Sequence, residues 1–416
     1  MRHNGLFPLY SEILQFKSDR LMTDSDTPIK RIALVIETSL GSGRQVLHGV
    51  SQYSHEKGNW RLFHIPRGLM ESVPDWLRDW DGDAIIARVQ DKKMARALLK
   101  LAIPVVDVLG VAPDKRIPVV HVDDRKIGRL AARSLSDAGI RNFGFFGITG
   151  ENWSIARLGG FRELVESRGG SVRCLEAPRE LESNPRAMRE TIGAWLSALP
   201  LPVGIMVSSD QRALHLLESC RELDIPVPEM ASVISVDNDA SLCELPTPTL
   251  TSIRAGHSRA GYEAARLLDR LLAREQIKPD TRLLVPASEI VERGSTDSPA
   301  VSDRAVAQGL RHIRENLKGE LTNERIARAS GISRTLFQRK FLTVIGKTVQ
   351  QFVLQSRLKN VARLMEHEQL SLAEIAELCG FCNQRYLGLI TKRERGKTPA
   401  VWRAELRRER STSPVD

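Results

Sequence analysis

Cysteine and long apolar runs are both scarce in this sequence, and each scarcity excludes a class of protein. The chain of 416 residues has five scattered cysteines: Cys174, Cys220, Cys243, Cys379 and Cys382. This pattern excludes a disulfide framework and favours a reducing compartment. No uncharged apolar run reaches the roughly 18 residues of a transmembrane helix, so we expect no membrane span. The N-terminal residues carry charges throughout and lack the apolar core of a secretory signal, which favours a cytoplasmic protein.

Motifs for catalysis and for cofactors are also missing. The nine histidines show no paired spacing typical of metal ligands, and no nucleophile motif is evident. Gly41-Ser-Gly43 is too short for a phosphate-binding loop, although a helix start can still accept a phosphate. Cys379 and Cys382 have redox-motif spacing, but no strand precedes them, which favours a packed turn over a thiol switch. We therefore expect no catalytic residue, no metal and no cofactor.

Positive charge is concentrated at the C-terminal end. The chain has a formal net charge of +10, from 61 basic and 51 acidic residues. Residues 305–416 hold 21 Lys and Arg against 11 Asp and Glu, whereas the first 304 residues hold 40 of each kind. Localised basicity of this kind neutralises phosphates, so we expect this segment to contact nucleic acid. A solvated basic surface is the alternative.

Two helix-turn-helix patterns occupy the same basic segment. The first runs from Leu321 to Phe341 and the second from Ser371 to Leu387, with Gly331 and Gly380 at their corners. A tight corner between helices often needs a left-handed residue, which glycine supplies. Polar residues follow each corner, where a DNA major groove could receive them. The sequence predicts an all-α double helix-turn-helix DNA-binding domain over residues 305–410, followed by a tail at 411–416.

Short apolar runs alternate with helical patterns between residues 30 and 297. The runs include Ile32–Ile36, Ala84–Ile86, Val119–Val122, Phe143–Phe146, Ile205–Val207 and Ser232–Val236. Buried parallel strands joined by helices have this rhythm. The length of the region favours two similar α/β lobes with a cleft between them. Residues 1–29 are expected to form a mobile tail, and the polar residues 298–304 a linker.

Several segments resemble known families. Ile205–Asp210, Val233–Asn238 and Leu250–Ile253 resemble the second lobe of LacI/GalR-type sugar sensors, whose fold is periplasmic-binding-protein-like. Gly396–Arg403 and the two helix-turn-helix units resemble the AraC/XylS-type DNA-binding domain. LacI-type proteins normally carry their DNA-binding helices at the N-terminus. The opposite order found here is similar to that of xylose-responsive bacterial transcriptional activators.

This resemblance implies a function and a set of partners. We expect a cytoplasmic, nucleoid-associated regulator that binds operator or promoter DNA and a sugar effector, D-xylose. The resemblance also implies a homodimer formed through the sensor domain and contact with RNA polymerase. A regulator for another monosaccharide or sugar derivative stays open, and so does a sugar-active α/β enzyme. A periplasmic binding protein is disfavoured by the charged N-terminus and the basic C-terminal segment.

The predicted sugar site combines acceptors and donors for hydroxyl groups. Sugars need carboxylates and amides as acceptors and arginine as a donor, at the carboxyl ends of strands. Asp210, Asp237 and Asn238 follow predicted strands. Arg157 falls where the resembling family places its sugar-contacting arginine, and Arg44 is the counterpart from the first lobe. Two alternatives stay open: Asp210 could cap a helix, and Arg157 could form a surface salt bridge.

Three further residues near predicted strand ends have simpler interpretations. Asp123 and Asp124 precede a predicted helix, so capping is favoured for both. Trp153 could stack on a sugar ring, but a core or hinge role is equally consistent with its position.

The resemblance to the AraC/XylS-type family also implies DNA contacts. In the first unit it places Thr335, Gln338 and Arg339 toward bases, and Ser333 and Arg334 near phosphates. Chemistry agrees in part, because arginine suits guanine and glutamine suits adenine in the major groove.

In the second unit, Asn383, Gln384 and Arg385 begin the recognition helix, and Arg385 is the expected base contact. Lys392 and Arg393 are available for phosphates.

The second unit departs from the family pattern at four positions. Leu389 replaces a common polar residue, and Thr391 and Arg395 stand where aromatic residues usually pack. Gly388 weakens a helix by roughly 1 kcal/mol relative to alanine. We therefore expect the second unit to be less stable, or to contact DNA mainly through the DNA backbone.

Overall fold

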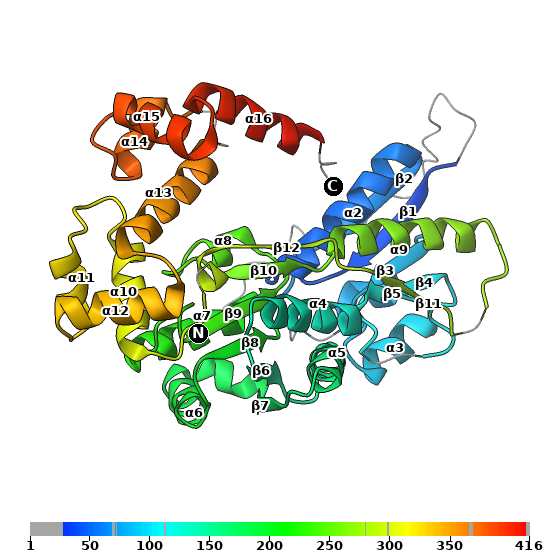
Figure 1. The fold of residues 1–416 in the computed structure, drawn as a ribbon. Coiled ribbons are helices and arrows are strands. Elements are labelled where there is room, and N and C mark those ends of the chain that lie inside the picture. The colour runs from blue at the N-terminus through cyan, green and yellow to red at the C-terminus, as the bar shows by residue number, and fades with distance from the viewer. Residues whose placement is uncertain are drawn as a thin grey trace, which may run out of the picture.

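The computed structural model (Figure 1) describes residues 28–412 except 69, 70, 72, 112, 113, 279, 298 and 366–368. Of the tails expected at 1–29 and 411–416, residues 1–27 and 413–416 lie outside the described residues, whereas the last helix continues to Thr412. The described chain forms two α/β lobes followed by a group of helices. None of the described helices is long and apolar enough to cross a membrane.

The first lobe is built on short parallel strands in the order β11-β5-β4-β3-β1-β2. The strands are β1 (Lys30–Val35), β2 (Trp60–His64), β3 (Ala84–Ala87), β4 (Val105–Asp107), β5 (Val119–Val122) and β11 (Arg282–Val285). The covering elements are α2 (Gly41–Lys57), α3 (Lys92–Leu99), α9 (His257–Leu272) and the 3-10 turn η1 (Asp75–Asp79). Ile86 packs in the core with α2 and α9, whereas Ile85 packs in the core with α3. Burial on both faces explains the continuous apolar runs.

The second lobe repeats this plan, with strand order β12-β10-β9-β8-β6-β7. Its strands are β6 (Asn142–Ile148), β7 (Val172–Ala177), β8 (Val203–Val207), β9 (Ala231–Val236), β10 (Thr251–Arg254) and β12 (Glu289–Val291). Its helices are α4 (Asp124–Asp137), α5 (Asn152–Ser167), α6 (Pro185–Ser197), α7 (Asp210–Glu222) and α8 (Ala240–Cys243), with 3-10 turns η2 (Arg179–Ser183) and η3 (Gly294–Thr296). The lobe forms the predicted doubly covered sheet.

The chain passes between the lobes three times. β5 leads into α4, β10 leads into α9, and β11 leads into β12. β12 closes the second sheet as an antiparallel edge strand, with Ser252 of β10 opposite Val291. The residues that follow strands of both sheets line one common cavity, as expected for ligand sites in open α/β folds.

The C-terminal helices form two helix-turn-helix units joined by a long helix. The elements are α10 (Arg304–Glu315), α11 (Asn323–Ala329), α12 (Arg334–Ile345), α13 (Val349–Met365), α14 (Leu372–Leu378), α15 (Gln384–Arg395) and α16 (Pro399–Thr412). Gly331 and Gly380 form the corners with φ of 70° and 75°, the left-handed conformation that a side chain disfavours. Cys379 is buried beside the second corner, which raises the pKa of its thiol to about 11 and agrees with a packed turn.

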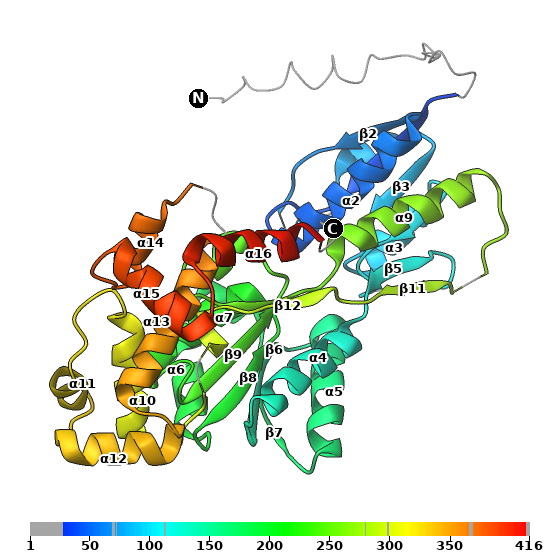
Figure 2. The same ribbon diagram turned by 45° about the horizontal axis from the view of Figure 1, so that its top comes forward.

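Helix α10 lies against the second lobe, beside α7, as Figures 1 and 2 both show. Asp224, which follows α7, pairs with Arg311 of α10 at 2.7 Å. Buried Glu229 pairs with Arg314 at 3.3 Å. Met230 of the second lobe belongs to the same apolar cluster as the core of α10 to α12. The segment expected to be a linker thus leads directly into a docked helix, which begins at Arg304.

Candidate functional site

A cavity of about 890 Å³ lies between the two lobes, at the carboxyl ends of their strands. Four of the five predicted sugar-site residues line it: Arg44, Arg157, Asp210 and Asp237. Sequence reasoning missed other charged or titratable lining residues: Glu71, Arg88, Asp91, His121, Glu151, Arg179, Glu180, Glu182, Asp239 and His257. Among the described residues, no group of three or more His, Cys, Asp or Glu is placed to hold a metal ion.

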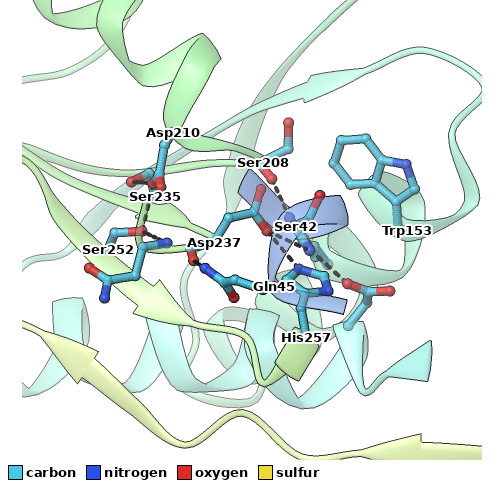
Figure 3. A network of polar contacts seen from close by, with 12 residues as sticks. Ser42, Gln45, Trp153, Ser208, Asp210, Ser235, Asp237, Ser252 and His257 are labelled. Carbon is cyan, nitrogen blue, oxygen red and sulfur yellow. Dashed lines mark hydrogen bonds and ion pairs between the residues drawn. The ribbon is translucent and has the colours of Figure 1, made fainter. Parts of the chain in front are cut away.

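Asp237 lies in a network of polar contacts at the end of β9 (Figure 3). One carboxylate oxygen lies 3.1 Å from His257 Nε2 and 3.6 Å from the Arg157 guanidinium. Burial opposes ionisation of Asp237, but the His257 hydrogen bond and the Arg157 charge outweigh it and lower the pKa. The backbone of Asp237 has a φ of 107°, and Gln45 Nε2 donates to its carbonyl oxygen at 3.2 Å. Such a backbone conformation in a non-glycine residue is often found at binding sites.

Arg157 is buried, with only 3% of its side chain exposed, so the surface salt bridge considered for it is excluded. Its Nε donates to Asp124 at 2.8 Å, and its Nη1 donates to the backbone carbonyl of Ser208 at 2.5 Å. The guanidinium also lies 4.9 Å from the centre of the Trp153 ring. These contacts fix the guanidinium against one side of the cavity.

The two aspartates at the start of α4 have different roles. Asp123 accepts a hydrogen bond from the backbone N–H of Lys126 at 3.0 Å and caps the helix, as predicted. The capping prediction is wrong for Asp124, whose carboxylate contacts Arg157 at 2.8 Å and His121 at 3.1 Å. Asp124 is the first helical residue after a crossing between the lobes, so its side chain turns into the network.

Asp210 is the first residue of α7 and is buried, with 2% of the residue exposed. Its carboxylate accepts hydrogen bonds from Ser235 Oγ at 2.5 Å, Ser252 Oγ at 2.6 Å and the backbone N–H of Asp239 at 2.8 Å. It forms no side-chain cap on α7, so the capping alternative is excluded. Burial, and then the charge of Asp237, raise the pKa of Asp210 to about 7.

Polar contacts join the lobes around the cavity. Arg44 of α2 pairs with Asp239 of the second lobe at 2.9 Å. Asn152 Nδ2, at the start of α5, donates to the backbone carbonyl of Val111 in the first lobe at 2.9 Å. With the Gln45 contact, these bonds hold the two lobes against each other. Arg44 therefore bridges the lobes as well as lining the cavity.

Asn238 differs from the prediction, because it does not line the cavity. Its backbone N–H donates to Ser252 Oγ at 3.0 Å, and its φ is 51°. Two consecutive residues with positive φ turn the chain sharply after β9. Asp237 and Asp239 thereby reach the cavity, while the residue between them does not.

Carboxylates outnumber arginines in the lining. The arginines are Arg44, Arg88, Arg157 and Arg179, and the carboxylates are Glu71, Asp91, Glu151, Glu180, Glu182, Asp210, Asp237 and Asp239. Each of these arginines pairs with a carboxylate: Arg88 pairs with Glu37, and Arg179 pairs with Glu151 at 2.6 Å. An anionic ligand would have to displace these carboxylates, whereas a neutral polyhydroxyl ligand could donate to them.

The predicted DNA contacts lie at the start and on the exposed face of α12 and α15. Ser333 and Asn383 are the N-caps of the two helices, so their side chains accept from helical N–H groups. Arg334 pairs with Glu324 of α11. Among the other residues predicted to contact DNA, Gln338 is half-buried. The exposed ones are Thr335, Arg339, Gln384, Arg385, Lys392 and Arg393.

The departures in the second unit have local explanations. Thr391 is fully buried and donates from Oγ1 to the Leu387 carbonyl at 3.0 Å, so its hydroxyl is satisfied within the helix. The Arg395 guanidinium lies 5.1 Å from the centre of the Trp402 ring. Leu389 is 63% exposed on the outer face, where it could contact DNA only through apolar atoms.

Comparisons with known proteins agree with this two-part architecture. Family models match residues 31–122 as a XylR N-terminal domain, 132–296 as a periplasmic binding protein-like domain and 326–405 as a helix-turn-helix domain. The xylose operon regulatory protein of Escherichia coli (strain K12) is 32% identical over 384 residues, which cover 90% of this chain and 96% of that protein. The chain belongs to the family of xylose operon regulatory proteins.

Other members of this family give the same result. The xylose operon regulatory protein of Haemophilus influenzae is 28% identical over 381 residues, covering 90% of this chain and 98% of that protein. The solved structure of a xylose-binding transcription activator matches with a TM-score of 0.77 and 29% identity, covering 91% of this chain and 99% of that one. As a member of this family, the chain is a sugar-sensing, DNA-binding transcription regulator and not an enzyme, as predicted.

Proposed function

We propose that this xylose operon regulator is an activator that binds free D-xylose in the cavity between its lobes. The observation that carries this proposal is the set of buried, oriented polar groups at the strand ends. Asp237 and Asp210 offer carboxylate oxygens and Arg157 offers guanidinium N–H groups. All are fixed by contacts within the protein, among them the contact of His257 Nε2 with Asp237. A pentose presents hydroxyls around its ring that suit such alternating acceptors and donors.

The charge of the cavity favours a neutral sugar over a phosphorylated or oxidised one. The lining arginines are paired, and carboxylates predominate. A phosphate group would meet these carboxylates without an unpaired arginine to receive it. Free sugar is therefore the expected effector class. The similar xylose operon regulatory proteins and the xylose-binding activator of known structure favour D-xylose within that class.

The same proposal extends to the assembly and its partners. We infer that the protein acts in the cytoplasm as a homodimer, because operator contact requires access to the chromosome and LacI-type sensors pair. Sugar binding would add contacts across the cavity to the polar contacts that already join the lobes, and so shift α10, which carries the DNA-binding helices on the second lobe. The repositioned helices would bind promoter DNA and recruit RNA polymerase.

A binding panel tests this proposal. Calorimetry on the full chain would compare D-xylose with L-arabinose, D-ribose, D-glucose, D-xylonate and a pentose phosphate. We expect D-xylose to bind most tightly and the anionic sugars to bind weakly or not at all. At a hundredfold excess over its dissociation constant, D-xylose should add about 2.7 kcal/mol to the free energy of unfolding. Preferred binding of the phosphate or of xylonate would overturn the proposal.

A further inference from the structure

The cavity extends along four strands of the second lobe. This length is greater than one sugar ring requires. Neighbouring strands in this part of the sheet are ordered β9-β8-β6-β7. Residues that follow each of them line the cavity, from Asp237 after β9 and Asp210 after β8 to Glu151 after β6 and Arg179 after β7. Three strand spacings of about 4.8 Å give a floor of about 14 Å. A single pyranose ring is roughly as wide as one such spacing.

The volume supports the same conclusion. Cavities of about 300–1,000 Å³ hold drug-sized ligands, and this cavity measures about 890 Å³. A free pentose is smaller than a drug-sized ligand and would fill only part of that space. The volume does not come from separated lobes, because Arg44, Gln45 and Asn152 each form a hydrogen bond to the opposite lobe. The extra room is present while the lobes are in contact.

The two ends of the floor carry separate polar groups. At the β9 and β8 end, Asp237 and Asp210 lie within one hydrogen-bonded network. At the β6 and β7 end, Glu151 pairs with Arg179 at 2.6 Å and Glu180 is exposed to the cavity. Trp153 lines the space and lies apart from Asp210, beyond Asp237 and His257 (Figure 3). Each end can therefore receive the hydroxyls of its own ring.

We propose that the cavity has two sugar subsites and accepts a neutral disaccharide of pentose units as an effector. One ring occupies the subsite at Asp210 and Asp237. The second ring occupies the subsite at Glu151 and Arg179, with Trp153 offering an aromatic face to its C–H groups. This inference rests on the proposed sugar-sensing function and extends the effector class of the same cavity.

Calorimetry on the full chain, with D-xylose and a β-1,4-linked xylose disaccharide as probes, tests the two subsites. We expect the disaccharide to bind with one-to-one stoichiometry. Arg179→Ala should lower the ratio of disaccharide affinity to xylose affinity about tenfold, because it removes a charged donor from the second subsite only. Glu180→Trp, on the exposed turn η2, should fill the second subsite and lower the same ratio further. Asp237→Ala should weaken both sugars.

The outcomes separate this proposal from the one on which it rests. Xylose binding without disaccharide binding would overturn the second subsite and leave the proposed function standing. Equal weakening of both sugars by Arg179→Ala, with no effect of Glu180→Trp on their ratio, would also overturn it. Failure of both sugars to bind the unmodified chain would overturn the proposed function itself.

Discussion

Asp237 is the residue on which the proposed sugar site depends most directly. Its carboxylate is ionised and oriented by His257 and Arg157, and one fifth of the side chain is exposed to the cavity. We predict that Asp237→Ala removes a charge-assisted hydrogen bond of roughly 1.5–3 kcal/mol and weakens D-xylose binding about tenfold or more. Calorimetry measures the affinity, and circular dichroism checks the fold. Asn238→Gly, on the adjacent residue off the cavity, is the matched control and should bind normally. Equal affinities in the two variants would contradict this assignment.

Asp210 makes stability depend on pH in a defined direction. Its pKa is raised to about 7 in the folded chain, against about 3.9 in an unfolded one. The native state then binds more protons between these values, so this group lowers the free energy of unfolding as pH rises from about 4 to about 7. Asparagine does not titrate, so we predict that Asp210→Asn removes this contribution. Melting temperatures of the sugar-free protein from pH 5 to pH 8 measure it. Parallel curves for both proteins would show that Asp210 does not titrate in this range.

Some cavity residues can be predicted from the sequence and others cannot. The two groups differ in how they reach the cavity. Asp210 and Asp237 were found because they follow apolar strands. His121, Asp124 and His257 were missed or misassigned, although they belong to the same network. They lie at two crossings between the lobes, His121 and Asp124 around the start of α4 and His257 at the start of α9, and they meet only after these two segments come together. Strand order, which a single sequence does not contain, was needed to bring them together.

The two predicted recognition helices, α12 and α15, are expected to make different kinds of contact with DNA. Arg339 is exposed on the second turn of α12, whereas Lys392 is exposed near the end of α15. We predict that Arg339→Ala costs about 1–3 kcal/mol and relaxes preference at one base position. Lys392→Ala should weaken binding to all sequences alike. It should also lower by about one the magnitude of the slope of log binding constant against log salt concentration. Measuring binding to single-base operator variants at several salt concentrations distinguishes a base contact from a phosphate contact. A uniform loss with a lower salt slope for Arg339→Ala would identify it as a phosphate contact.

Helix α7 connects the two functional regions of the molecule. It begins at Asp210 beside the cavity and, over 13 residues or roughly 20 Å, reaches Asp224 at α10. Asp224 accepts hydrogen bonds from Arg311 at 2.7 Å, Gln308 at 3.3 Å and Arg304 at 3.5 Å. The helix that carries the DNA-binding units is therefore docked directly on the second lobe, at the far end of α7 from the cavity.

Removing Asp224 should uncouple the two regions while leaving the cavity intact. We predict that Asp224→Ala speeds amide hydrogen exchange in α10 and reduces the effect of D-xylose on DNA affinity. Sugar affinity should stay normal, because Asp210 and its partners are unchanged. Glu222→Ala is the control, since Glu222 lies at the same end of α7 but pairs with Arg189. Unchanged exchange in α10 would show that the other docking contacts suffice.

The strands that the sequence pattern does not predict lie at the edges of the two sheets. The central strands were predicted because both of their faces are buried and their residues are continuously apolar. β2 and β7 were not predicted, because as edge strands they expose part of each face and include Arg61, His64, Arg173 and Glu176. Both helix-turn-helix units are predicted from the sequence, because their signals are local: a glycine corner followed within a few residues by polar positions.

At the scale of the whole molecule, the described chain combines a cavity between two lobes with a DNA-binding domain. Two-fold pairing is the commonest way for such a chain to contact two operator half-sites, and LacI-type sensors pair through this domain. We predict that the full-length protein sediments as a dimer at micromolar concentration. DNA with two half-sites should then bind at least about tenfold more tightly than DNA with one, because the second contact is intramolecular. The same comparison with the half-sites shifted by about half a helical turn, roughly 5 bp, tests whether both domains bind together. A monomer in sedimentation that binds both DNAs equally would exclude the dimer and leave each chain acting alone.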